Sequence, residues 1–291
     1  MKKAISILLS LTLAFSLAAC TTTSTHNSET NVSVDVSAEE NAAPQEEEEL
    51  SWHYETQMEG KKGEYNAEDG AVVMATSFDL PYLSVICNVE GVEAEAPDYM
   101  KKTVEAFNSA SDQMMDRLIE EANGYAADAK EMYESLEESK RADFEPWTEE
   151  VTLGDVRSSD RLCSILLNGY LNIGGPHPTN FNSVFNFDLD DAKSVKLSDL
   201  TDDPAALNAA VAEEIITQIK ANNLEEEFYE NYAETLRGMQ EFTVMFNGVD
   251  AVTVLLGEYE LAPHAVGLPS FDVNYSVLTP HLNDYGKALL A

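Results

Sequence analysis

The chain has 291 residues, with 53 acidic side chains against 17 basic ones and a formal net charge of −36. This excess of negative charge argues against nucleic acid and anionic lipid head groups as partners. The length allows one or two domains with a real hydrophobic core. The charge fits either a solvated surface or attraction to a cationic partner.

The N-terminus has the layout of a bacterial export signal. Lys2 and Lys3 precede an apolar stretch, and Leu17-Ala18-Ala19-Cys20 ends it with small residues before a cysteine. This ending resembles the lipobox of bacterial lipoproteins, in which the cysteine is diacylated. The resemblance implies a signal peptide over residues 1–20, lipidation of Cys20, and attachment to the extracytoplasmic face of the cell membrane through that lipid.

The next segment, residues 21–49, is rich in Ser, Thr, Asn and Glu and has almost no large apolar side chains. A segment of this composition buries too little surface to offset the entropy lost on ordering. We therefore expect a disordered acidic tether, with folded structure from Leu50 onward.

The first folded part combines strands with one long helix. We expect strands over residues 52–56, 71–78 and 82–89, with a polar turn over 61–70 and Pro81 separating the second and third. From Pro97 to Leu136, apolar residues recur every three or four positions, which predicts an amphipathic helix that Gly124 breaks or kinks.

A strand over residues 144–156 is followed by two long apolar runs, 161–173 and 179–189, around the sequence Gly174-Gly175-Pro176-His177-Pro178. Paired glycines open unusual backbone angles, and prolines fix φ on both sides of the histidine. The pattern predicts a hairpin that presents His177 on a stiff, exposed loop. A plain connection without a role for His177 is the competing interpretation.

The last third predicts two helices and a hairpin. Asp203 and Pro204 begin a helix that runs to residue 221, and a second helix spans 224–237. Asn247-Gly248 joins strands 242–246 and 251–256, and a final strand covers 270–277. The order of elements predicts an α+β fold of mainly antiparallel sheets, with a long helix in the N-terminal half and two helices inserted in the C-terminal half.

The sequence contains none of the common catalytic motifs for hydrolases, metalloproteases or nucleotide binding. His177 and His264 stand in loops of the folded region, but a zinc site needs more ligands than this pair offers. We expect no metal, no cofactor and no catalytic residue. Cys87 and Cys163 lie in strand-like runs and form either a disulfide or two buried thiols.

Several separate motifs occur in one order: the Gly174–Pro178 loop, Phe185-Asn186-Phe187-Asp188, Val195–Leu200, two helices, and Glu258-Tyr259-Glu260-Leu261-Ala262-Pro263 before Gly267. Together they are similar to the C-terminal extracellular domain of RsiV-type anti-sigma factors, a domain of unknown function in many bacterial lipoproteins. The likeness implies an RsiV-like α+β domain over residues 161–280 and a tail over 281–291. It also implies a small α+β companion domain over 50–160, as in cell-surface proteins of Gram-positive bacteria.

The family includes receptors for lysozyme and accessory domains of peptidoglycan deacetylases. The resemblance therefore implies a non-enzymatic binding protein for a lysozyme-like cationic protein or for cell-wall peptidoglycan. Its candidate contact residues are Gly174, Gly175, His177, Asn186, Tyr259, Pro263 and His264. Two alternatives stay open. One is an envelope hydrolase centred on His177, which requires both histidines to converge with a carboxylate in one pocket, and the other is a regulatory domain for a membrane partner.

Overall fold

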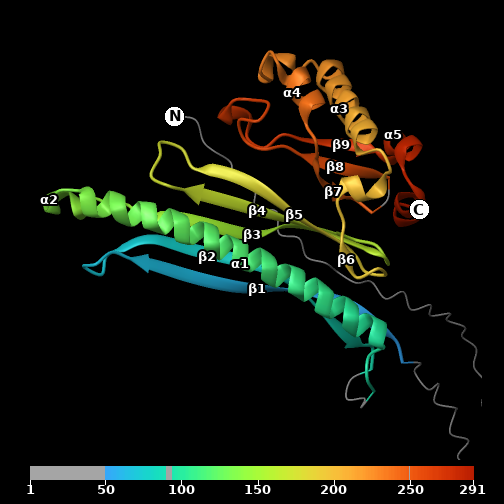
Figure 1. The fold of residues 1–291 in the computed structure, drawn as a ribbon, viewed down its shortest axis with the longest axis horizontal. Coiled ribbons are helices and arrows are strands. Elements are labelled where there is room, and N and C mark those ends of the chain that lie inside the picture. The colour runs from blue at the N-terminus through green and yellow to red at the C-terminus, as the bar shows by residue number, and fades with distance from the viewer. Residues whose placement is uncertain (1–49, 90–93, 249) are drawn as a thin grey trace, which may run out of the picture. The chain divides into compact units, whose positions relative to one another are not determined.

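The computed structural model describes residues 50–89, 94–248 and 250–291, which belong to one compact unit (Figure 1). The expected signal peptide, the lipidation site at Cys20 and the tether over 21–49 lie outside the described residues. Within the part that is described, no helix combines the length and the apolar character needed to cross a bilayer.

A six-stranded sheet forms the centre of this unit. Its strands stand in sequence order from β1 to β6, and all neighbours are antiparallel except the parallel pair β2 and β3. The strands are β1 (Trp52–Asn66), β2 (Val72–Cys87), β3 (Trp147–Ser158), β4 (Leu162–Asn172), β5 (Thr179–Asp188) and β6 (Lys193–Ser194).

Helix α1 (Asp98–Ser135) packs along one face of this sheet and is followed by the short α2 (Glu138–Arg141) (Figure 1). Its buried positions recur at the three- and four-residue steps that the sequence predicts. Phe107 of α1 lies against Phe185 and Phe187 of β5, with ring centroids 4.6 and 5.1 Å away. The expected break at Gly124 is wrong, because α1 continues through it as one helix.

A second, three-stranded sheet lies against the opposite face of β4 and β5. It consists of β7 (Thr243–Phe246), β8 (Ala251–Leu255) and β9 (Ser270–Asn274), with the predicted hairpin at Asn247-Gly248 joining the first two. The helices around it are α3 (Pro204–Ala221), α4 (Tyr232–Gly238), α5 (Tyr275–Leu278) and α6 (Asp284–Leu289). The Asp203 side chain accepts a hydrogen bond from the Ala206 N–H, as the capping prediction requires.

Asn186 joins the two sheets. Side chains alternate between the faces of a strand, so Asn186 points away from α1 while its neighbours Phe185 and Phe187 point toward it. The Asn186 amide donates to the Val244 carbonyl at 2.8 Å, and its side-chain oxygen accepts from the buried Ser164 hydroxyl. The prediction of Asn186 in a contact loop therefore needs correction: the residue is buried inside β5.

The α+β fold class is confirmed, but several element boundaries differ from the predictions. β1 extends through the expected turn at 61–66, and β2 passes through Pro81 without a break. β2 pairs with β3 only over Met74–Phe78, so at Pro81 the strand has β1 as its single partner and needs no donor on the other side. The expected helix over 224–237 is a short 3₁₀ turn (Glu225–Glu227) followed by α4.

The expected domain boundary between residues 160 and 161 falls in the turn between β3 and β4, which pair along their length. The two expected domains thus share one sheet. Residues 281–291 contain α6, whose Tyr285 hydroxyl donates to the buried Asp188 carboxylate at 2.9 Å. Arg161, just before β4, binds the same carboxylate at 2.8 Å. The segment expected to be a tail is therefore hydrogen-bonded to the end of β5, next to the start of β4.

Candidate functional site

The loop between β4 and β5 has the backbone that its glycines predict. Gly174 adopts a φ of 78°, and a side chain at this position would collide with the Trp147 indole. The Gly174 N–H donates to the Asn172 side chain at 3.1 Å. Gly174 and Gly175 line a cavity of about 390 Å³ beside Trp147, whereas His177 does not.

A second loop, residues 257–267, runs between β8 and β9. Gly257 donates its N–H to the Glu260 side chain at 2.8 Å, which closes a tight turn around the two residues between them. One of these, Tyr259, adopts a φ of 62° and leaves 52% of its surface exposed. A bulky residue with positive φ is uncommon and strained, so the fold holds this ring in place at an energetic cost.

The two loops meet through their aromatic rings. His264 stacks on His177 with a centroid distance of 5.1 Å, and on Tyr259 with a centroid distance of 5.6 Å. We call Tyr259, His264 and His177 the ring array. Three of the seven predicted contact residues therefore come together, although His177 and Tyr259 are 82 positions apart.

Glu258 lies behind the ring array and is almost fully buried, with 2% of its side chain exposed. Its Oε1 accepts a hydrogen bond from Asn180 of β5 at 2.8 Å, and its Oε2 lies 3.4 Å from His264 Nδ1. Burial alone would raise the pKa of Glu258, but the Asn180 hydrogen bonds and the neighbouring imidazole outweigh it and lower the pKa. The carboxylate is thus ionised and lies beside His264, although neither Glu258 Oε2 nor His264 Nδ1 has a hydrogen-bond partner among the described residues.

Sequence reasoning missed Glu258 and Asn180 as parts of the site. Asn180 stands in an ordinary strand, and Glu258 is 78 positions away from it, so no local pattern connects them. The one available local signal is that Glu258 directly precedes Tyr259.

The remaining predicted contact residues lie elsewhere or play a different part. Pro263 is exposed and begins the short 3₁₀ turn His264–Val266 that carries the second imidazole. Gly174 and Gly175 shape the first loop, and Asn186 belongs to the sheet interface. Cys87 and Cys163 are both free thiols, and burial raises the pKa of Cys163 to about 11.

The ring array offers two kinds of chemistry. Its exposed, immobilised aromatic faces suit contact with a partner. Its imidazole beside an ionised carboxylate also has the arrangement of an oriented general base. Among the described residues, no group of three or more His, Cys, Asp or Glu side chains is placed to hold a metal ion.

Comparison with known proteins gives a fold. No protein-family model matches the chain, and no curated protein matches it. Two solved bacterial structures of the DUF3298 family resemble it. The one from Bacteroides fragilis has 14% identity, a TM-score of 0.54, and coverage of 79% of this chain and 94% of its own. The one from Pseudomonas aeruginosa PAO1 has 17% identity, a TM-score of 0.48, and coverage of 80% and 95%.

At sequence identities this low, structural likeness shows only that the folds are similar. The RsiV-type relationship stays a prediction. The chain shares the fold of a bacterial DUF3298 family protein.

Proposed function

We propose that this chain is a lipid-anchored binding protein of the bacterial envelope that captures a lysozyme-like cationic protein through the ring array. The observation that carries the proposal is the exposed Tyr259, held at positive φ and stacked on His264. A strained backbone of this kind costs about 1–3 kcal/mol and persists where the surroundings over-determine it, typically at binding sites. A merely structural loop would gain stability from glycine or asparagine at this position.

Charge supports a cationic partner. The net charge of −36 draws basic proteins toward the surface and raises their rate of encounter. The ionised Glu258 adds a fixed negative charge directly behind the rings. Specificity then rests on the ring array, because a diffuse field attracts any cationic protein.

Titration of the purified protein with lysozyme, at low and moderate salt, tests the proposal. The most informative variant is Tyr259→Gly, which removes the ring and relieves the positive φ. We expect it to lose binding while its unfolding midpoint stays equal or rises. The matched control Tyr229→Ala removes a tyrosine of comparable exposure (38%) outside the ring array and should bind normally. Absence of lysozyme binding at both salt concentrations would refute the protein-partner proposal.

Peptidoglycan is the alternative ligand within the same proposal. Sedimentation of the protein with purified cell walls distinguishes a glycan ligand from a protein ligand. If the ligand is a glycan, the wild-type protein should sediment with the walls at moderate salt and the Tyr259→Gly variant should not.

The lipid anchor has its own test. Replacing the lipidated residue (Cys20→Ala) should move the protein from the membrane fraction to the soluble fraction.

The hydrolase alternative also has an observation in its favour. His264 stacks on His177 and lies 3.4 Å from the Glu258 carboxylate, which brings two imidazoles and an acid near one another, as part of this alternative requires. In such an enzyme Glu258 would orient His264, and His264 would accept a proton from a water molecule. Incubation with purified peptidoglycan, followed by assay of released soluble fragments, tests this. Equal release by the wild-type protein and a His264→Gln variant would dismiss it.

A further inference from the structure

A cavity lies at the opposite end of β4 from the ring array, where the six-stranded sheet splits. β2 and β3 pair only over Met74–Phe78 and separate beyond it. The space between them, closed by the start of α1, has a volume of about 400 Å³. This volume falls within the range of about 300–1,000 Å³ that is typical of small-ligand sites.

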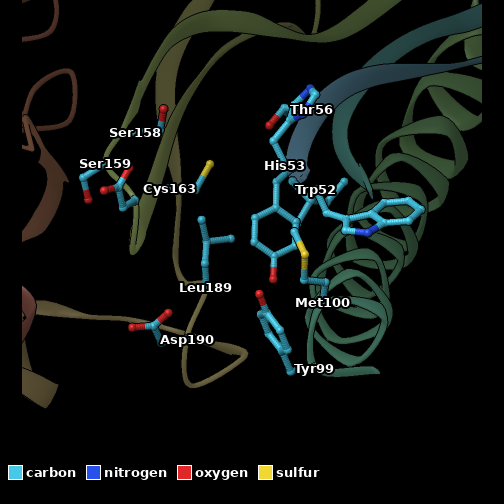
Figure 2. Close-up of a pocket in the computed structure, with 13 residues that line it drawn as sticks. Trp52, His53, Thr56, Tyr99, Met100, Ser158, Ser159, Cys163, Leu189 and Asp190 are labelled. Carbon is cyan, nitrogen blue, oxygen red and sulfur yellow. The ribbon is translucent and has the colours of Figure 1, made fainter. Parts of the chain in front are cut away.

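The two sides of this cavity differ in chemistry, as Figure 2 shows. Figure 2 places Trp52 and Tyr99 on one side and Ser158 and Asp190 on the other. Tyr54 and Asp160 also line the cavity. We call this cavity the tyrosine pocket.

The tyrosine pocket is lined by the carboxylates of Asp160 and Asp190 and, among the described residues, by no lysine or arginine. Arg161 approaches Asp190 at 3.7 Å, but its shorter bonds go to Asp188 outside the pocket, at 2.8 Å. Burial raises the pKa of Tyr54, with smaller contributions from Tyr99 and Asp190, and its hydroxyl is buried without a hydrogen-bond partner among the described residues.

We propose that the tyrosine pocket binds an organic ammonium group. Aromatic faces attract cations through the negative potential above the ring, and carboxylates at the rim complete a cage that neutral or anionic ligands cannot use as well. Burial raises the pKa of Cys163, the thiol in the wall of the pocket, to about 11, so this sulfur is protonated at neutral pH.

Two sources can supply such a group: a lysine side chain of a protein, or a small quaternary amine such as choline. The inference does not depend on the ring array, because the residues of the two sites lie at opposite ends of β4. Lysozyme binding at the ring array and ammonium binding in the tyrosine pocket are therefore measured independently. Failure of one proposal leaves the other standing.

The test uses NMR of the purified protein at constant ionic strength, with choline chloride replacing sodium chloride. The chain has two tryptophans, of which Trp52 lines the tyrosine pocket and Trp147 lines a different cavity. We expect a saturable shift of the Trp52 indole signal at about millimolar choline, with the Trp147 signal unchanged as an internal control. The neutral isostere 3,3-dimethyl-1-butanol should bind at least ten-fold more weakly.

Two variants locate the binding. Tyr99 is 67% exposed, so Tyr99→Ala leaves the core intact and should weaken choline binding about two- to five-fold. Asp160→Asn should weaken it by a similar factor, whereas Tyr229→Ala should have no effect. A parallel titration with Nα-acetyl-lysine methylamide shows which source binds more tightly. Equal binding of the alcohol and choline, or a response to chitobiose without one to choline, would overturn the proposal.

Discussion

Glu149 provides the sharpest test of the energetics of this fold. It lies in β3 between the buried residues Trp147 and Val151, on the face that packs against α1, with 2% of its surface exposed. Its Oε2 atom is buried and has no hydrogen-bond partner among the described residues. Burial, with a smaller contribution from the nearby Glu121 charge, raises the pKa of Glu149 from 4.5 to about 7.

The consequence for stability follows from proton linkage. Below pH 4.5 the Glu149 carboxyl is protonated in both the folded and the unfolded protein and imposes no ionisation cost. As the pH rises from about 4.5 to about 7, the unfolded chain releases its proton while the folded chain retains it, so the free energy of unfolding falls. A pKa difference of about 2.5 corresponds to about 3 kcal/mol of stability lost by pH 8.

The variant Glu149→Gln keeps the shape of the protonated acid and cannot ionise. We expect its stability relative to the wild type to rise between pH 5 and pH 8, by about 3 kcal/mol at most. Urea unfolding at pH 5, 6, 7 and 8, at constant ionic strength, measures this difference. The neighbouring exposed residue supplies the control, since Glu150→Gln should show no such trend. A wild-type-minus-variant difference that stays constant over this pH range would refute the reasoning.

Three further substitutions test the packing. Gly169→Ala in β4 should destabilise the protein by about 1–3 kcal/mol, because the new methyl group would overlap the Phe181 ring of β5. Gly286→Ala should be at least as harmful, since α6 touches the Leu200 backbone at this glycine, and a melting temperature equal to the wild type would contradict the docking of α6. Asn186→Ala should cost about 1–3 kcal/mol in urea unfolding by leaving a buried carbonyl of β7 without its donor.

Local signals in the sequence predicted local structure well. The stripe of apolar residues predicted α1, the capping pair Asp203-Pro204 marked the start of α3, and Asn247-Gly248 marked the hairpin. In each case the information lies within a few residues of the element that it determines.

The errors arose where tertiary context overrides local preference. Lys61, Lys62 and Gly63 resemble a turn, but β1 is an edge strand, in which exposed lysines are tolerated because they face water. Pro81 looked like a break because the sequence does not reveal that β2 lacks a second partner there. Each error depended on knowing which strands are neighbours.

The candidate site was predictable only in part. His177 and His264 were identified because glycine and proline mark the loops that carry them. Their stacking, and the buried Glu258 behind them, depend on contacts between segments about 80 positions apart. The burial of Glu149 could have been predicted from the sequence, because alternation along the strand places it on the same buried face of β3 as Trp147 and Val151.

The support beneath the ring array bears on the choice between binding and catalysis. Asn180 of β5 donates a hydrogen bond to Glu258, the Glu258 carboxylate lies beside His264, and His264 stacks on both Tyr259 and His177. These contacts connect the loop of strained backbone to the start of β5, so under the binding proposal the ring array would meet its partner already ordered. A rigid aromatic surface loses little side-chain entropy on association, which favours affinity. The imidazoles also stack on one another, which limits the room for a substrate between them and favours the binding proposal over the hydrolase alternative.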